Sequence, residues 1–157
     1  MIKKVKIFDM DGTTVCSLHR YKTLIDDKGI EKIDLDYWRA NEYRAMDDSL
    51  LPLSKQYQRD IQDKEIYTII ATARILRAAD MQFINEILGK PDHIISRKEG
   101  SNISGGLLKI NGLKRFFNLK NFKNAAWTFY EDNFDYLRQV CSFFQINGVY
   151  VPSKQGH

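Results

Sequence analysis

Two aspartates near the start of the chain, Asp9 and Asp11, have the residue type and spacing for carboxylate chemistry. They follow the apolar, β-prone run Val5–Phe8 and come before a glycine and two threonines. This order predicts a buried strand that ends at two carboxylates and a tight turn. In open α/β sheets, ligands bind in the crevice beyond the carboxyl ends of the strands. Because two carboxylates placed there repel each other, the pair indicates a metal ion or a chemical role.

Other reactive side chains follow later β-prone runs. Thr72 follows the second run, Glu131 and Asp132 follow the fourth, and Lys109 lies just before an expected helix. The carboxyl ends of parallel strands meet at one edge of a sheet, so these side chains can approach Asp9. The set suits phosphoryl transfer, in which a carboxylate attacks phosphorus once a divalent cation such as Mg²⁺ neutralises the negative charge. A lysine and a hydroxyl can then hold the phosphoryl oxygens.

Five β-prone runs alternate with helical patterns along the chain. They occupy residues 5–8, 66–71, 93–96, 126–130 and 148–151. The runs are almost continuously apolar, which is typical of a parallel sheet covered on both faces. Apolar residues at helical spacing predict helices over 78–88 and 134–144 and a short helix around 113–117. Strands that alternate with helices predict an α/β fold with a doubly wound parallel sheet.

One segment interrupts this alternation. About fifty residues separate Gly12 from the second run, whereas a crossover needs only about a dozen. A helix over 50–62 can provide the crossover, so residues 17–46 are expected to form a small helical insertion, or lid element, over the strand edge. Long insertions beside such an edge often control access or specificity. This one contains the basic and aromatic residues His19, Arg20, Tyr21, Lys22, Trp38, Arg39, Tyr43 and Arg44.

The composition is typical of a globular domain. The chain has 157 residues, of which 43% are hydrophobic and 28% charged, and this length suits one domain with a single core. No apolar run approaches the ~20 residues that span a bilayer, and no signal-peptide pattern is present. Two cysteines are too few for a disulfide scaffold, so a reducing cytoplasm is the expected location. The net charge of +4 is compatible with phosphorylated or nucleic-acid partners and demonstrates neither.

Taken together, the motifs resemble those of the haloacid dehalogenase (HAD) superfamily. In chain order the four matching motifs are Asp9-Met10-Asp11-Gly12-Thr13, Ile69-Ile70-Ala71-Thr72-Ala73-Arg74, Lys109 and Phe129-Tyr130-Glu131-Asp132. The resemblance covers nearly the whole chain and implies a single HAD-like hydrolase domain over residues 1–157. It also implies a five-stranded, Rossmann-like parallel core in which the strands, numbered along the chain, have the order 3-2-1-4-5.

The resemblance assigns a role to each matching residue. Asp9 would be the nucleophile that forms an aspartyl-phosphate, and Asp11 would be the general acid and base. The catalytic set would be Asp9, Asp11, Thr72 and Lys109. Residues that bind the phosphate or substrate would be Gly12, Thr13, Ala73 and Arg74. Mg²⁺ would be held by Asp9, Asp132, the backbone carbonyl of Asp11 and, through a water, Glu131.

Some of these assignments have open alternatives. Lys98, Lys114 or Arg97 could supply the cation instead of Lys109. Thr72 also suits a helix N-cap, which does not exclude a role in the site. The acidic pair after the fourth run also suits the start of a helix, where the macrodipole favours negative charge.

The acid at position 11 favours hydrolysis, because superfamily members without it include dehalogenases and the cation-pumping ATPases, whose phosphoenzyme must survive. The resemblance therefore implies a Mg²⁺-dependent phosphomonoester hydrolase, with a phosphomutase as an alternative. The layout is similar to the phosphatase part of polynucleotide kinase-phosphatases, which removes 3′-phosphates from nucleic-acid ends. Two substrate classes remain open: nucleic-acid ends or nucleotides, and small sugar or metabolite phosphates. A non-catalytic binding module is the alternative from another class, and the oligomeric state is left open.

Overall fold

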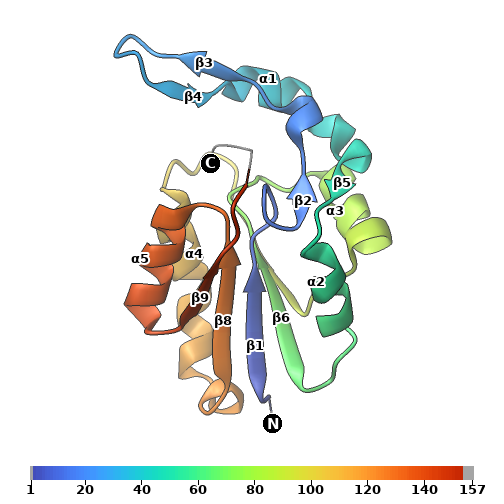
Figure 1. Ribbon diagram of the computed structural model, residues 1–157, viewed down its shortest axis with the longest axis vertical. Helices are drawn as coiled ribbons and strands as arrows, with labels where there is room; N and C mark the ends of the chain where they lie inside the picture. Colours follow the sequence, from blue (N-terminus) through green and yellow to red (C-terminus); the bar gives the residue numbers. More distant parts are fainter. Residues whose placement is uncertain (1, 154–157) are drawn as a thin grey trace.

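A five-stranded parallel sheet forms the centre of the computed structural model, which describes residues 2–153. Its strands are β1 (Lys4–Phe8), β6 (Ile66–Ala71), β7 (His93–Ile95), β8 (Ala126–Glu131) and β9 (Asn147–Tyr150). They lie in the order β7-β6-β1-β8-β9, and every neighbouring pair is parallel (Figure 1). Numbered along the chain, this is the order 3-2-1-4-5. The predicted doubly wound α/β fold is confirmed.

Strand β1 lies in the middle of the sheet and sets the register of the functional edge. Phe8 is opposite Ile70 on β6 and Tyr130 on β8. The backbone N–H of Asp9 donates a hydrogen bond of 3.0 Å to the carbonyl of Tyr130. Asp9 and Glu131 therefore leave the sheet at the same edge.

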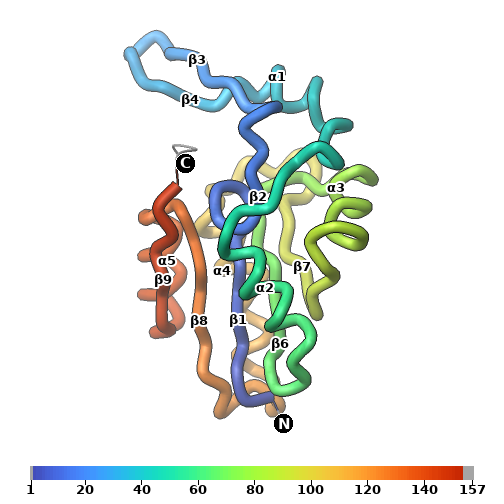
Figure 2. Tube along the Cα trace, turned by 45° about the vertical axis from the view of Figure 1, so that its right-hand side comes forward, coloured from blue at the N-terminus to red at the C-terminus, as the bar shows by residue number. Residues whose placement is uncertain are grey.

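Helices cover both faces of the sheet (Figures 1 and 2). One face carries α2 (Ser54–Asp60), α3 (Ala78–Phe83) and the helical turn η3 (Ile84–Leu88). The other carries α4 (Gly105–Leu113), the turns η4 (Lys114–Asn118) and η5 (Lys120–Phe122), and α5 (Phe134–Phe144). Among residues 2–153, no helix is long and apolar enough to cross a membrane.

Successive residues of β1 enter two different hydrophobic cores. Val5 and Ile7 pack into the core beneath α4 and α5. Phe8 packs on the other face, edge-on against Tyr57 at a centroid distance of 5.2 Å and stacked on Tyr130 at 4.7 Å. Burial on both faces explains why the apolar residues of this strand, Val5, Ile7 and Phe8, do not simply alternate with polar ones.

The segment 17–46 forms an arm above the carboxyl edge of the sheet (Figure 2). Short strands β2 (Val15–Cys16) and β5 (Ser49–Leu50) pair antiparallel at its base. The arm contains η1 (Leu18–Arg20), β3 (Thr23–Ile25), β4 (Glu31–Ile33), α1 (Leu35–Ala40) and η2 (Glu42–Asp47).

Part of this arm is a β-hairpin, whereas the sequence predicted a helical insertion. Strands β3 and β4 have three residues each and pair antiparallel. Five of their six residues are exposed and Ile33 is half-buried, so no alternation of polar and buried apolar residues marks them in the sequence.

Helix α4 also differs from the expectation, because Lys109 lies within a helix and not before one. The side chain of Ser104 caps the helix by accepting a backbone hydrogen bond. Gly105 and Gly106 form its first turn, and glycine is a poor helix former, so the sequence obscures the helix start. Close packing requires the small residue, since a Cβ on Gly105 would lie 2.6 Å from a ring carbon of Tyr136.

Candidate active site

Three buried carboxylates meet at the carboxyl ends of β1 and β8. Carboxylate oxygens of Asp9, Glu131 and Asp132 lie within 4.8 Å of one another. The Lys109 ammonium lies among them, with Nζ 2.9 Å from Asp9 Oδ1 and 2.5 Å from Glu131 Oε2. All four side chains are buried. One positive charge does not balance three negative ones, so this acidic cluster has a surplus of negative charge when its carboxylates are ionised.

Asp132 is the least compensated of the three carboxylates. Its Oδ2 is buried and has no hydrogen-bond partner within residues 2–153. Burial, together with the nearby charges of Asp9 and Glu131, raises the pKa of Asp132 to about 10. Gly12 makes room for this carboxylate, because a Cβ at position 12 would lie 2.1 Å from Oδ2.

Thr13 links Asp9 to Asp132 through two hydrogen bonds. Its hydroxyl donates to Asp9 Oδ2 at 3.0 Å and accepts from the backbone N–H of Asp132 at 3.0 Å. The neighbouring Thr14 hydroxyl donates to the Asp9 carbonyl at 2.9 Å. These bonds fix the turn after β1 against the end of β8, 119 residues further along the chain.

The donor set of the cluster fits a hard divalent cation. Asp9, Glu131 and Asp132 each offer a carboxylate oxygen, the kind of ligand that Mg²⁺ prefers. Both oxygens of Glu131 already accept hydrogen bonds, from Lys109 and from the backbone of Asn133. Asp132 Oδ2 accepts none within the described part of the chain, which leaves it free for a cation. The site would thereby gain the positive charge that Lys109 alone does not supply.

Of the four cations considered from the sequence, Lys109 contacts Asp9. Asp9 and Glu131 outweigh its burial and raise the pKa of Lys109, so the ammonium stays protonated. Lys98 and Lys114 are exposed. The Arg97 guanidinium donates to backbone carbonyls, including that of Ala73 at 2.9 Å.

Thr72 is buried at the end of β6, and its hydroxyl accepts a hydrogen bond of 3.1 Å from the backbone N–H of Arg74. It is not the cap of the following helix, since Arg77 is the N-cap of α3. Asn133, and not the acidic pair before it, is the N-cap of α5. Thr72 therefore lies outside the capping role that was its alternative, whereas Glu131 and Asp132 directly precede the N-cap of α5, where the macrodipole favours negative charge.

The Asp11 side chain pairs with Arg74 and is not part of the acidic cluster. Arg74 donates from Nε to Asp11 Oδ2 at 2.7 Å and from Nη2 to Oδ1 at 2.6 Å. The Ser17 hydroxyl donates to Oδ1 at 2.6 Å. A bidentate pair of this kind fixes the carboxylate in both position and orientation.

A buried ion network surrounds this pair. Arg74 also donates hydrogen bonds to the carboxylates of Asp48, at 3.0 Å, and Asp80, at 2.9 Å. Arg20 makes two bonds of 3.0 Å to Asp48 and one of 3.3 Å to Asp80. Although burial lowers the pKa of Arg74, the carboxylates of Asp11, Asp48 and Asp80 outweigh it and raise that pKa overall. The network joins the arm, through Arg20, to the core.

The sequence analysis assigned no role to Asp48 or Asp80 and named Arg20 only among the basic and aromatic residues of the insertion. Their partners lie far away in the chain, up to 60 residues for Arg20 and Asp80. No local spacing marks such pairs. Two arginines and two aspartates that are all buried form a signal only when the fold is known.

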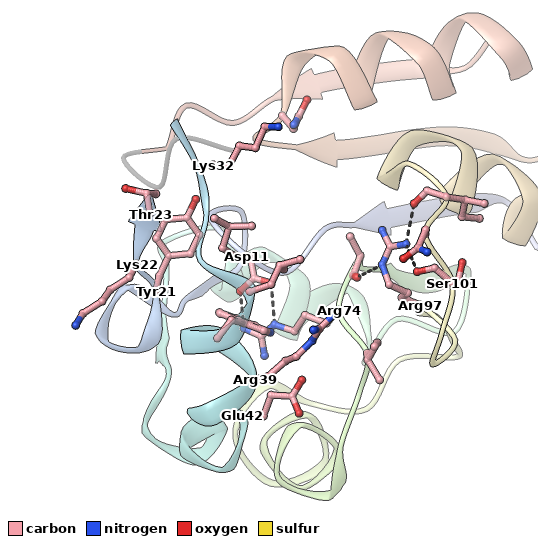
Figure 3. A pocket seen from close by; sticks show the side chains of 18 of the residues that line it. Asp11, Tyr21, Lys22, Thr23, Lys32, Arg39, Glu42, Arg74, Arg97 and Ser101 are labelled. Carbon is pink, nitrogen blue, oxygen red and sulfur yellow. Dashed lines mark hydrogen bonds and ion pairs between the residues drawn. The ribbon is translucent and has the colours of Figure 1, made fainter. Parts of the chain in front are cut away.

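A cavity of about 1110 Å³ opens between the arm and the core. Figure 3 shows Tyr21 on one side, Arg97 on the other, and Asp11 with Arg74 between them. The cavity is also lined by Lys22, Lys32, Trp38, Arg39, Ala73 and Tyr136. Asp11, two residues after Asp9 of the acidic cluster, thus faces this much larger space.

The fold and the position of the acidic residues define a HAD-fold protein, and solved structures agree. A chain of the "Pnkp1/Rnl/Hen1 complex" matches with a TM-score of 0.64 at 16% identity, over 97% of this chain and 46% of that chain. The HAD domain of the effector protein Lem4 from Legionella pneumophila matches with a TM-score of 0.60 at 13% identity, over 99% and 88% of the two chains. At such identities the likeness concerns the fold. The HAD-like fold that the sequence predicted is confirmed.

A narrower family also matches. The family model described as "Bacteriophage T5 5'-deoxynucleotidase" covers residues 1–123, and the chain belongs to this family. A relative, the 5'-deoxynucleotidase of Escherichia phage T5, is 31% identical over 88 residues, which are 54% of this chain and 35% of that protein. The match thus spans about a third of the length of that relative.

The surplus of negative charge leads to a prediction about Asp132→Asn. The pKa of Asp132 is raised from 3.8 to about 10, so between these values the folded state binds a proton that the unfolded state lacks. Stability without metal should therefore fall as the pH rises through this window. We expect Asp132→Asn to raise the melting temperature in EDTA at pH 8 by a few degrees, since one kcal/mol corresponds to about 2–4 °C in a chain of this size.

Differential scanning fluorimetry with and without Mg²⁺ checks this expectation. Mg²⁺ should stabilise the wild type and should have little effect on Asp132→Asn. A variant that is less stable than the wild type in EDTA would show that the cluster carries no unbalanced charge.

The ion network leads to a second prediction. Arg20→Met removes one buried cation and leaves Asp48 and Asp80 without full compensation, which should lower the free energy of unfolding by about 3–5 kcal/mol. The matched control is Arg39→Met, because Arg39 belongs to the same arm and is exposed, and surface changes usually stay within ~0.5 kcal/mol. Urea denaturation measures both, and equal losses would contradict the role of the network.

Proposed function

We propose that the protein is a divalent-metal-dependent phosphatase of nucleoside 5′-monophosphates that forms an aspartyl-phosphate on Asp9. The observation that carries the proposal is Asp9 itself, which lies beside the Lys109 ammonium at 2.9 Å and within the acidic cluster. Membership of the phage T5 5'-deoxynucleotidase family supports the substrate class. The name of the T5 relative supports it as well.

In the first step, a carboxylate oxygen of Asp9 attacks phosphorus while the bond from phosphorus to the leaving oxygen breaks. Lys109 donates to the phosphoryl oxygens, and Thr72 contributes its hydroxyl, so that negative charge is stabilised in the transition state. Mg²⁺ bound by Asp9 and Asp132, with Glu131 acting through a water, would neutralise carboxylate and phosphate charge and so allow the two anions to meet.

Asp11 acts on the leaving group and then on water. It donates a proton to the departing oxygen, and the carboxylate that results takes a proton from the water that attacks the aspartyl-phosphate. The bond between Asp9 and phosphorus then breaks, which releases phosphate and restores Asp9. The contacts of 2.6–2.7 Å from Arg74 and Ser17 hold Asp11 as the carboxylate, which is the form that accepts the proton from water.

The size of the cavity favours a large leaving group. The oxygen that Asp11 protonates must lie next to Asp11, and the rest of the leaving group must extend from there. Asp11 lines the cavity of about 1110 Å³, which is at least as large as the ~300–1,000 Å³ of common ligand pockets. A nucleoside therefore fits, and Gly12 and Thr13 at the phosphate end with Ala73 and Arg74 beside the cavity would form the substrate path.

A substrate panel tests the proposal. It compares hydrolysis of deoxyadenosine 5′-monophosphate (dAMP), a 3′-phosphorylated oligonucleotide and a sugar phosphate, each in Mg²⁺ and in EDTA. We expect dAMP to have the highest kcat/KM, EDTA to abolish turnover, and Asp9→Asn to lower kcat by about 1,000-fold or more. Asp11→Asn should lower kcat by about 100- to 10,000-fold.

Two outcomes would contradict the proposal. The phosphatase assignment fails if no phosphomonoester is hydrolysed in a metal-dependent way. The nucleotide assignment alone fails if the 3′-phosphorylated oligonucleotide or the sugar phosphate is the better substrate.

A further inference from the structure

One aromatic ring of the arm separates the buried ion network from the cavity. Trp38, on α1, lines the cavity and is half-buried. The guanidinium of Arg20 lies over the Trp38 ring, 4.2 Å from its centroid, while Arg20 itself is fully buried and does not line the cavity. The indole therefore forms the wall between this guanidinium and the cavity.

The same ring is close to the group that acts on the leaving oxygen. The guanidinium carbon of Arg74 lies 5.5 Å from the Trp38 ring centroid, and Arg74 holds Asp11 in a bidentate pair. A substrate whose leaving oxygen meets Asp11 must place the rest of its leaving group in the cavity that Trp38 lines. This step rests on the proposed function, in which Asp11 protonates the leaving oxygen.

Two other large rings, those of Tyr136 and Tyr21, also line the cavity, and each has other neighbours. Tyr136 packs over Gly105, where a Cβ would lie 2.6 Å from the ring, and the Lys109 ammonium lies 5.6 Å from its centroid. Tyr21 is partly buried near Asp11 and Asp132. Tyr136 and Tyr21 thus lie near the charged residues of the strand edge, whereas Trp38 lies against Arg20 of the buried ion network.

Indole is well suited to hold a nucleobase. Base–aromatic stacking needs a flat face and tolerates every base, because each base has a π-face. A guanidinium on one side of an indole is a favourable cation–π contact, and it fixes the ring so that little freedom is lost when a ligand stacks. Arg39 and Glu42, which also line the cavity, lie one and four residues further along the arm and add polar groups beside the ring.

We propose that Trp38 is the residue on which the nucleobase of the substrate stacks. The contact distinguishes a nucleotide from a phosphate ester that has no base. Loss of a stacked base typically weakens nucleic-acid binding by about 5- to 150-fold. Trp38 is a specificity-determining residue in this account, since it touches the leaving group and not the reacting atoms.

The kinetic test compares two substrates that differ only in the base: dAMP and 2-deoxyribose 5-phosphate. We expect Trp38→Leu to lower kcat/KM for dAMP by about 5- to 150-fold, mainly by raising KM, and to leave 2-deoxyribose 5-phosphate within about 2-fold. Trp38→Phe should recover part of the loss. The matched control is Tyr37→Leu, because Tyr37 is the neighbouring aromatic residue, packs under Lys22 and does not line the cavity.

Three kinetic outcomes would overturn the proposal. An equal loss for both substrates would mean that the indole only supports the arginines. No loss for dAMP would mean that the base lies elsewhere. A wild type that prefers dAMP no more than 2-deoxyribose 5-phosphate would mean that the base is not recognised, although the protein is a phosphatase.

A binding test decides the inference even if the wild type hydrolyses nothing and the proposed function fails. The chain has two tryptophans, and Trp127→Phe leaves Trp38 as the only one. In an Asp9→Asn, Trp127→Phe variant, dAMP should quench the Trp38 fluorescence in a saturable way, and 2-deoxyribose 5-phosphate should not. Equal quenching by both ligands, or none by dAMP, would overturn the stacking contact.

Discussion

The arrangement of this protein depends on one electrostatic constraint, which is the burial of three carboxylates around a single lysine. Asp9, at the end of β1, and Glu131 and Asp132, at the end of β8, have carboxylate oxygens within 4.8 Å of one another. Lys109 reduces their repulsion without removing it, and Asp132 Oδ2 is left without a hydrogen-bond partner among the described residues. Such a cluster is costly in a folded chain unless a cation or a chemical task requires it. The close turn at Gly12 leaves room for the Asp132 carboxylate, and the hydrogen bonds of Thr13 link Asp9 to Asp132.

A second buried set of charges gives Asp11 a separate environment from Asp9. Arg74 and Arg20 are shared among Asp11, Asp48 and Asp80, and the arm supplies Arg20. The two aspartates of the first motif are thus held by different partners, a lysine for one and an arginine for the other. This division matches the two tasks of a phosphatase, which needs a nucleophile and a proton carrier. It also makes the arm, through Arg20, part of the network that orients Asp11.

The strands and the strand-end residues could be predicted from the sequence, because a buried parallel strand leaves a continuous apolar run and its end is marked by polar residues. The runs at 66–71 and 126–130 agree with β6 and β8 to within one residue. The β3–β4 hairpin could not be predicted, since its short strands are exposed. The start of α4 could not be predicted because its first turn contains two glycines, which are poor helix formers. Their small size is required by the close packing of Tyr136 and Gln139. The network of Arg20 with Asp48 and Asp80 joins distant residues and requires the fold to be seen.

The central claim is that Asp9 carries the phosphoryl group between substrate and water. Rapid acid quenching after mixing the protein with dAMP and Mg²⁺, followed by peptide mass mapping, tests it most directly. The account predicts a phosphoryl group on Asp9 that hydroxylamine removes, as expected for an acyl phosphate, and that is absent from Asp9→Asn. Turnover of dAMP without any phosphoryl group on Asp9, or with the group on another residue, would contradict the account.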